Sequence, residues 1–274
     1  MPAMETDRQS LEREALRQDF DCLRQAVRAA GGIALSYFGK NPKVQTKPDG
    51  TDVSEADLQV NAFLEERLRT GRSSYGWLSE ESEDDKSRLT RERVWIVDPI
   101  DGTRAFLKNR PQWTISVGLV QEGRPILAAV FNPATEEFFE ARAGSGAKLN
   151  GSPIHIAASR SLAECRIIAS RNSLRRAGWP NPIFDAEFLS VNSIAYQLCL
   201  ASAGIVDAVI SLSRKSDWDL AAAHLIVMEA GGKVTTHRNG AIGYNGIESL
   251  HESVIAAGPA LHGRLIKQAD ALSL

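Results

Sequence analysis

The chain has 274 residues, a length at which a hydrophobic core tends to split, so we expect two lobes. Lysine and arginine number 32 and aspartate and glutamate 34, and this near-balance argues against a nucleic-acid-binding surface, which needs clustered positive charge. No run of about 18 apolar residues occurs and the N-terminal stretch is charged, so neither membrane insertion nor export is indicated. The three cysteines are far apart, which favours reduced thiols in a cytoplasmic protein.

Two helices are predicted in the N-terminal part of the chain. Apolar residues recur at three- and four-residue steps from Leu16 to Phe38, which predicts a long packing helix that ends at Gly39. Further on, the segment Ser54–Asp57 has the form of a capping box and predicts the start of a second helix. Asp57 is then in the first turn, where a carboxylate interacts favourably with the helix dipole whether or not it has another role.

Carboxylates follow two short apolar segments at the points where strands are expected to end. Val94–Val97 is apolar and rich in β-branched residues, which predicts a buried strand, and Pro99 is expected to prevent the strand from continuing. Asp98 and Asp101 then lie in the turn after this strand. Glu80 and Glu81 follow a second short strand, which is predicted at Tyr75–Leu78. Neighbouring strands could deliver these side chains to one edge of a sheet. An Asp-x-x-Asp pair is also common in ordinary turns, so the spacing alone does not establish a metal site.

The second half of the chain differs in pattern from the first. Residues 113–141 alternate between apolar and polar with turn residues between, which predicts an antiparallel meander. Beyond residue 152, apolar runs are separated by helical segments. We therefore predict an α/β fold (mixed α+β and α/β) of layered helices and sheets. Residues 1–151 would form an α+β subdomain with the meander and most metal ligands, and residues 152–274 an α/β subdomain that supplies Asp219 and substrate contacts.

Another helix is predicted to open at Ser216–Asp219 and to stop at the glycine pair 231–232. Asp219 lies in its first turn and completes a set of five carboxylates at the edges of elements. The five histidines show neither metal-ligand spacing nor pairing with a candidate nucleophile. Sites built only from oxygen ligands select hard cations such as Mg²⁺. The set consists of Asp57, Glu80, Asp98, Asp101 and Asp219.

Three motifs occur in order along the chain: Ser79–Ser82, Asp98–Thr103, and Trp218–Asp219 followed by Glu229–Gly232. In this order they resemble the inositol monophosphatase superfamily of Mg²⁺-dependent phosphomonoesterases, over essentially the whole chain. The resemblance implies a layered, sugar-phosphatase-like fold and two or three Mg²⁺ ions per active site. It assigns as metal ligands Glu80, Asp98, Asp101, Asp219 and the backbone carbonyl of Ile100.

The resemblance also implies a mechanism. Asp57 and Thr103 would orient the attacking water, Glu80 would share in catalysis, and backbone N–H groups of Gly102 and Thr103 would bind the phosphate at a helix start. Closely spaced cations can neutralise phosphate oxygens, activate a water molecule and stabilise the leaving alkoxide. We therefore expect in-line attack by a metal-activated water, without a protein nucleophile.

Substrate choice depends on fewer residues. Superfamily members that act on inositol monophosphate have a glutamate a few residues before the Trp-Asp pair, whereas this chain has Arg214 and Lys215 in that region. These cations are expected to bind a second phosphate on the substrate, since arginine recognises phosphate through a bidentate fork. Two solvated surface charges are the alternative interpretation. Ser193 is also expected to be a substrate contact.

Two segments, Asp101–Phe106 and Ala169–Ser173, are similar to bacterial 3'(2'),5'-bisphosphate nucleotidases, which convert adenosine 3',5'-bisphosphate to AMP and phosphate. Two positions depart from that branch, which usually has a histidine where Ser173 stands and a proline where Asp52 stands. The expected partner is thus a small phosphate ester, and a homodimer is compatible with the resemblance. Inositol 1-phosphate and histidinol phosphate are alternative substrates, and a catalytically silent binding or regulatory protein is an alternative of another class.

Overall fold

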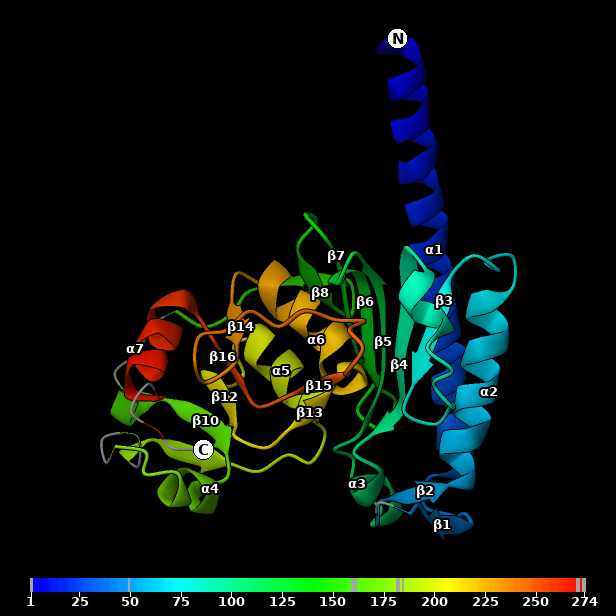
Figure 1. The fold of residues 1–274 in the computed structure, drawn as a ribbon. Coiled ribbons are helices and arrows are strands. Elements are labelled where there is room, and N and C mark those ends of the chain that lie inside the picture. Colours follow the sequence, from blue (N-terminus) through cyan, green and yellow to red (C-terminus); the bar gives the residue numbers. More distant parts are fainter. Residues whose placement is uncertain are drawn as a thin grey trace.

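The computed structural model describes residues 2–48, 50–158, 162–180, 183, 185–269 and 272, and helices and sheets alternate in layers through the molecule (Figure 1). One layer is a seven-stranded sheet. Its first two strands are parallel and the others follow as an antiparallel meander, which confirms the meander predicted from the sequence. In spatial order the strands are β3 (Gly76–Ser79), β4 (Arg93–Asp101), β5 (Thr114–Gln121), β6 (Arg124–Asn132), β7 (Glu137–Arg142), β8 (Ala147–Leu149) and β9 (Ser152–Ile154).

Two helices, α1 (Pro2–Tyr37) and α2 (Glu55–Arg69), cover the outer face of this sheet (Figure 1). Their apolar residues form one buried cluster with side chains of β4, β5 and β6. The capping box predicted for α2 is present, because Ser54 is the N-cap and exchanges hydrogen bonds with Asp57. Within the described part of the chain, no helix combines the length and the apolar character needed to cross a membrane.

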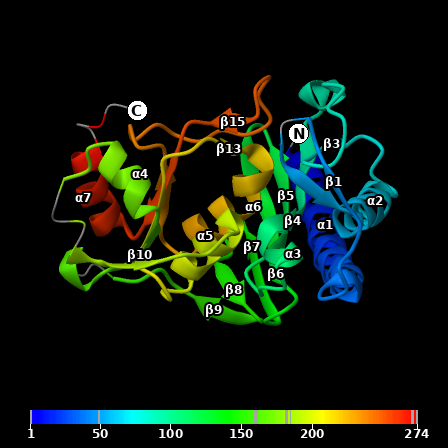
Figure 2. The ribbon, with the colours of Figure 1, turned by 90° about the horizontal axis from the view of Figure 1, so that it is seen from below.

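The inner face of the sheet is covered by α5 (Ile194–Ser202) and α6 (Asp217–Glu229), which lie between the two large sheets in both views (Figures 1 and 2). The second sheet has five strands, with parallel pairs at one side and antiparallel pairs at the other. Its far face is covered by α4 (Arg171–Arg176) and α7 (Pro259–Ala269). In spatial order its strands are β11 (Glu187–Leu189), β10 (Arg166–Ala169), β12 (Ala208–Ser211), β16 (Val254–Ala257) and β14 (Lys233–Thr235).

Shorter elements surround the ends of these layers. Two small antiparallel pairs are β1 (Val44–Thr46) with β2 (Asp52–Ser54), and β13 (Lys215–Ser216) with β15 (Leu250–His251). The others are the helix α3 (Thr103–Leu107) directly after β4 and the 3₁₀ turns η1 (Ser87–Thr90) and η2 (Leu162–Glu164).

The predicted end of β4 at Val97 is wrong. The strand continues through Pro99 to Asp101, but its pairing with β5 is irregular between Asp98 and Asp101. Over this interval β4 advances three residues while β5 advances two, from Ser116 to Thr114, which is a β-bulge. Because proline has no N–H to give to the ladder, it is tolerated at such a bulge, and the pairing resumes one residue out of step.

The two predicted subdomains share a hydrophobic core. The first sheet ends at Ile154, just beyond the proposed boundary at 151, and α6 from the C-terminal half packs on β5 and β6. One buried cluster joins side chains from both halves, including Val94 and Phe139 with Leu220 and Val254. Whether residues 1–151 and 152–274 are separate units stays a prediction.

We predict that Gly118→Ala destabilises the protein by about 1–3 kcal/mol, because the added methyl group overpacks a close contact. A Cβ at Gly118 would lie 3.2 Å from the backbone nitrogen and 3.4 Å from the Cα of Ala222 in α6. Urea unfolding measures the change. The control is Gly32→Ala in α1, where a Cβ meets nothing within 4 Å. Since alanine favours helix, this control should gain about 0.5–1 kcal/mol. Equal stabilities of the two variants would contradict close packing of α6 on β5.

Candidate metal centre

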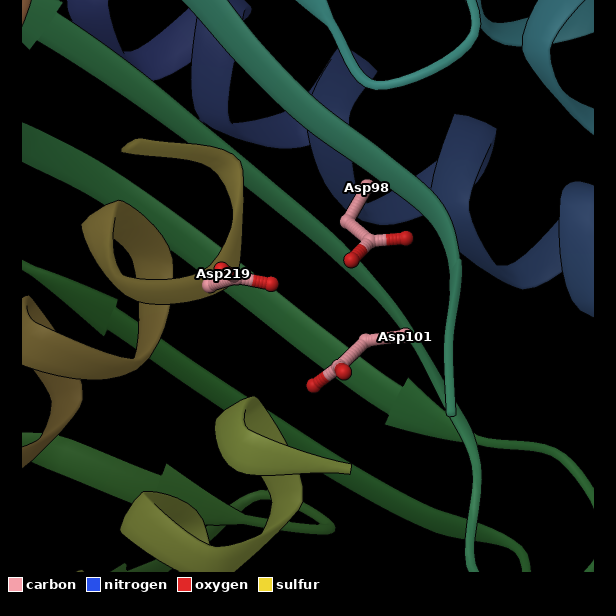
Figure 3. A group of neighbouring side chains, drawn as sticks. All are labelled: Asp98, Asp101 and Asp219. Carbon is pink, nitrogen blue, oxygen red and sulfur yellow. The ribbon is translucent and has the colours of Figure 1, made fainter. Parts of the chain in front are cut away.

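Three aspartates converge between the first sheet and α6. Asp98 and Asp101 come from β4 and Asp219 from the first turn of α6 (Figure 3). One carboxylate oxygen from each lies within 4.8 Å of the others. Asp98 and Asp101 are buried, at 1% and 6% exposure. The structure therefore brings together three of the predicted metal ligands.

The bulge in β4 is what turns Asp98 and Asp101 to the same side. Side chains alternate along a regular strand, so residues three apart would face opposite sides of the sheet. Ile96 packs in the cluster that includes α6, whereas Ile100 packs with Val97 in the cluster on the α1 and α2 side. The change of face between Ile96 and Ile100 shows that the extra residue reverses the alternation. Asp101 thereby reaches the side of Asp98.

In Asp101 and Asp219, one carboxylate oxygen is held by hydrogen bonds from the protein. Asp101 Oδ2 accepts hydrogen bonds of 2.6 Å from Ser193 Oγ and from the backbone N–H of Ala195. Asp219 Oδ2 accepts one of 2.6 Å from the backbone N–H of Ser216. Asp98 Oδ1 is buried and has no hydrogen-bond partner among the described residues. Such fixing of one oxygen orients the other toward a ligand.

Burial and mutual repulsion make the ionised forms of these carboxylates unfavourable. Burial, followed by the charges of Glu80 and Asp101, raises the pKa of Asp98 well above its usual value. Burial and the charge of Asp219 raise the pKa of Asp101 to about 7, although hydrogen bonds from Ser193 and Ala195 lower it. Burial raises the pKa of Asp219 to about 6. A divalent cation would offset this repulsion, and the all-oxygen donor set and the unpartnered Asp98 Oδ1 fit a hard cation such as Mg²⁺.

Glu80 lines a cavity together with the three aspartates, and it also forms an ion pair with Lys47. The cavity, of about 210 Å³, is lined by Glu80, the three aspartates and Ile100 among others. Lys47 Nζ lies 3.3 Å from Glu80 Oε1 and 2.7 Å from Glu81 Oε1. Glu80 is consequently not part of the group of oxygens within 4.8 Å of one another. Burial raises the pKa of Glu81 to about 7, although the hydrogen bond from Lys47 lowers it.

Asp57 caps the helix α2 and also lies beside the candidate site, so its place in the structure is compatible with both roles that its sequence position left open. Its Oδ2 caps α2 by accepting hydrogen bonds from the N–H and hydroxyl of Ser54, at 2.8 and 2.5 Å. Its Oδ1 lies 3.2 Å from the hydroxyl of Thr103, which is also 3.0 Å from the carbonyl oxygen of Ile100. Burial raises the pKa of Asp57, and the hydrogen bonds from Ser54 and Thr103 lower it. Asp57 and Thr103 thus form a pair beside the acidic cluster.

Gly102 is required by the fold at this point. Its φ of +97° is a left-handed conformation that favours glycine. A Cβ there would lie 2.9 Å from the carbonyl oxygen of Gln112 and 3.3 Å from Ser193 Cβ. These contacts explain the glycine without a phosphate. Its predicted role and that of Thr103 in binding phosphate through backbone N–H groups stay predictions.

A larger cavity adjoins the acidic cluster, and only some of the predicted substrate contacts line it. It measures about 380 Å³ and shares Asp101, Asn192 and Asp219 with the smaller cavity. Lys215 lines the larger cavity, whereas Arg214 is exposed and lines neither. Ser193 is completely buried and lines neither cavity, because its hydroxyl is directed to Asp101. Its position suits a residue that orients Asp101 rather than one that contacts substrate.

Sequence reasoning missed two residues of the site. Lys47 stands in a polar segment with nothing to distinguish it from other surface lysines, and its partners are 33 and 34 residues away. Asn192 at the junction of the two cavities likewise has no local signal. Glu81, by contrast, is indicated by the sequence together with Glu80, because both come just after β3.

Comparison with known proteins gives one consistent result. A family model described as the inositol monophosphatase family matches residues 15–274. The chain is 34% identical over 226 residues to an inositol-1-monophosphatase of Rhizobium meliloti, covering 79% of this chain and 84% of that protein. It is 32% identical over 251 residues to a histidinol-phosphatase of Mycobacterium tuberculosis, covering 85% and 94%. The crystal structure of extragenic suppressor protein suhB from Bartonella henselae matches with a TM-score of 0.81 and 28% identity, covering 92% and 98%.

We predict that the cation-free protein loses stability as pH rises from about 4 to about 7. Asp101 and Asp219 have folded-state pKa values of about 7 and about 6, above their usual 3.8. The folded state therefore binds these protons more tightly, and the resulting stability is present below the unfolded pKa and is lost as pH rises through the folded one. Thermal unfolding in chelator across this range measures the fall, and Mg²⁺ should reverse it.

Two variants separate the acidic cluster from other buried carboxylates. Asp98→Asn removes one repelling charge, so it should raise the melting temperature in chelator at about pH 7.5 by roughly 2–4 °C and abolish the response to Mg²⁺. Asp19→Asn is the control, because Asp19 is buried beside Arg72 and Tyr75. It should lower the melting temperature and keep the response to Mg²⁺. Destabilisation by Asp98→Asn in chelator would contradict the predicted repulsion.

Proposed function

Because the chain belongs to the inositol monophosphatase family, whose members are phosphoric monoester hydrolases, we propose that it is a Mg²⁺-dependent phosphatase of a nucleoside 3',5'-bisphosphate, releasing the 3'-phosphate. The observation that carries the substrate class is the lining of the larger cavity beside the acidic cluster. Membership of the family supports hydrolysis at that cluster, and the cavity lining supports the choice of ester.

The cation ligands in this proposal are the side chains of Glu80, Asp98, Asp101 and Asp219 with the carbonyl oxygen of Ile100. All five residues line the smaller cavity. When bound, Mg²⁺ supplies positive charge that offsets the phosphate oxygens and makes a water molecule easier to deprotonate. Lys47 holds Glu80 and Glu81 beside this space.

Asp57 and Thr103 provide a path for the proton of the attacking water. The Thr103 hydroxyl donates to Asp57 Oδ1, so its lone pairs can accept a hydrogen bond from a water molecule. As the water oxygen bonds to phosphorus and the ester P–O bond breaks, a proton can pass through Thr103 Oγ1 to Asp57, and the leaving alkoxide takes a proton from solvent and departs as the alcohol. The raised pKa of Asp57, caused by its burial, favours its acceptance of that proton.

The larger cavity combines apolar walls, hydroxyl groups and one cation. Apart from Asp101 and Asp219 of the acidic cluster, none of the described residues that line it is acidic. An aromatic base suits aliphatic walls, and a second phosphate suits a lysine. The apolar lining residues include Ile168, Leu174, Leu189, Val191, Ile210 and Leu212.

Lys215 is the cation that the proposal assigns to the second phosphate. Its Nζ lies 2.8 Å from Ser213 Oγ and 3.1 Å from the carbonyl oxygen of Arg214. Both partners are neutral, and no carboxylate of the described residues forms an ion pair with Lys215, although its charge lowers the pKa of Asp219. Arg214 was expected to share this role, but its exposed position outside the cavity favours the solvated-charge interpretation.

Inositol 1-phosphate is the second candidate substrate, favoured by the names of relatives. The Rhizobium meliloti protein is an inositol-1-monophosphatase, and the Mycobacterium tuberculosis protein is a histidinol-phosphatase. A polyol with several hydroxyls or a cationic amine would be matched best by an additional carboxylate. Apart from Asp101 and Asp219, the described residues that line the larger cavity are neutral or cationic, which supports the nucleotide over both.

We predict that phosphate release is fastest from adenosine 3',5'-bisphosphate. In assays with Mg²⁺, its kcat/KM should exceed those of inositol 1-phosphate and histidinol phosphate by roughly tenfold or more, since a charged hydrogen bond contributes about 1.5–3 kcal/mol. Chelator and Asp98→Asn should each abolish release. A preference for inositol 1-phosphate would reject the nucleotide assignment, and no release from any of the three would reject the proposed activity.

We predict that Lys215→Ala raises the KM for adenosine 3',5'-bisphosphate roughly tenfold and changes kcat little, because the second phosphate is bound equally before and during reaction. The KM for inositol 1-phosphate, which has no second phosphate, should not change. Arg214→Ala is the matched control, a neighbouring cation outside the cavity, and should leave both KM values within about twofold. Equal effects of the two substitutions would contradict the assignment of the second phosphate to Lys215.

A further inference from the structure

A buried arginine, Arg88, connects the segment that carries Glu80 with the segment that carries Asp219. Arg88 itself lies outside the acidic cluster. Arg88, in η1, is 1% exposed although it is charged. Its Nε and Nη2 donate to the two carboxylate oxygens of Asp84 at 3.0 and 2.8 Å, a bidentate pair. Its Nη1 donates to Asn245 Oδ1 at 2.7 Å and to the carbonyl oxygen of Gly246 at 3.0 Å. The guanidinium therefore joins residues about 160 positions apart in the chain.

One side of this connection is the loop that carries Glu80. Asp84 lies four residues after Glu80 in the segment between β3 and η1. Burial raises the pKa of Asp84, but hydrogen bonds from Arg88 and Lys86 outweigh it and lower that pKa to about 2. Lys86 makes a second bridge at the surface, from Asp84 Oδ2 at 2.7 Å to the carbonyl oxygen of Ile247 at 3.1 Å.

The other side of the connection is the start of α6, which carries Asp219. The backbone N–H of Asn245 donates to Asp217 Oδ2 at 2.8 Å, and His251 Nε2 lies 2.7 Å from Asp217 Oδ1. Asp217 is completely buried and is the first residue of α6, two before Asp219. In Figure 2 the segment before β15 turns toward the segment between β3 and β4. A continuous series of hydrogen bonds thus runs from the Glu80 loop to the first turn of α6.

A buried ion pair of this kind is a weak source of stability, because desolvation of both charges offsets their attraction. What a bidentate guanidinium does supply is a fixed distance and direction, since two parallel hydrogen bonds define its plane. One of the two segments fixed by Arg88 carries Glu80 and the other carries Asp219. The two segments belong to different layers of the fold.

We propose that Arg88 is a positioning residue that sets the spacing of Glu80 and Asp219 and thereby raises the affinity of the site for its cation, without contacting cation or substrate. The inference rests on the proposed function, which assigns Glu80 and Asp219 as cation ligands. It requires that loosening the connection weakens cation binding while the substrate-binding cavity is unaffected.

Asn245→Gly tests the connection with little disturbance of the backbone. Asn245 has a φ of +60°, which glycine adopts freely. The substitution removes the side-chain acceptor of Arg88 Nη1 and the 3.4 Å hydrogen bond from Asn245 Nδ2 to the Arg88 carbonyl oxygen, and retains the N–H that binds Asp217 and the carbonyl oxygen of Gly246. We expect the dissociation constant for Mn²⁺, measured from the electron paramagnetic resonance signal of the free ion, to rise roughly tenfold. The Mg²⁺ concentration for half-maximal activity should rise equally, while KM at saturating Mg²⁺ stays within about twofold.

Asn239→Gly is the matched control, because Asn239 has a φ of +58° in an exposed turn outside this series of bonds. It should bind Mn²⁺ as wild type does. Arg88→Lys, which keeps the charge but not the fork, should weaken Mn²⁺ binding at least as much as Asn245→Gly. Wild-type Mn²⁺ affinity in Asn245→Gly would overturn the inference. Wild-type affinity in Glu80→Gln and Asp219→Asn would instead overturn the assignment of the ligands, which separates the two failures.

Discussion

Three mutually repelling carboxylates are held within 4.8 Å of one another, and much of the surrounding structure serves to keep them there. Left to themselves, Asp98, Asp101 and Asp219 would separate or remain protonated, since burial and like charge both oppose ionisation. The bulge in β4 places two of them on one face, and the hydroxyl of Ser193 fixes Asp101. Such a cluster lowers the stability of the cation-free protein. This cost is typical of functional sites, where local unfavourable energy is compensated by the rest of the fold.

The packing of the helix α6 on the first sheet fixes the position of Asp219. Its start is fixed by Asp217, which binds the backbone N–H of Asn245, and its end by Glu229, whose carboxylate accepts hydrogen bonds of 2.8 and 2.7 Å from the backbone N–H groups of Gly144 and Gly146. Between these ends the helix lies close to β5 at Gly118. A segment of the C-terminal half is therefore anchored along the N-terminal sheet, and these contacts fix Asp219 relative to the aspartates of β4.

Local patterns singled out the carboxylates of the site because each stands where the sequence indicates an element boundary, although Asp98 lies inside β4, and the family resemblance assigned them as ligands. The capping box at Ser54 and the helix start at Ser216 are examples, and the layered fold follows from the meander and the later alternation of helices and strands. The bulge could not be predicted, because Pro99 alone indicates a strand end and only the register of β5 shows that pairing resumes. Lys47 and Arg88 were missed for a similar reason, since their partners are distant in sequence and each lies in an unremarkable polar segment.

The site consists of two adjoining cavities, and the proposed function assigns the chemistry to the smaller one and the choice of ester to the larger one. The smaller cavity is lined mainly by residues of the N-terminal half, and the larger one mainly by residues of the C-terminal half between positions 168 and 215, with Asp101, Asn192 and Asp219 common to both. Substitutions in the larger cavity can therefore change the leaving group that fits without disturbing the carboxylates. Proteins similar to this chain at 34% and 32% identity carry the names of different phosphatases, an inositol-1-monophosphatase and a histidinol-phosphatase. In such a family, the cavity lining is a better guide to the substrate than overall identity.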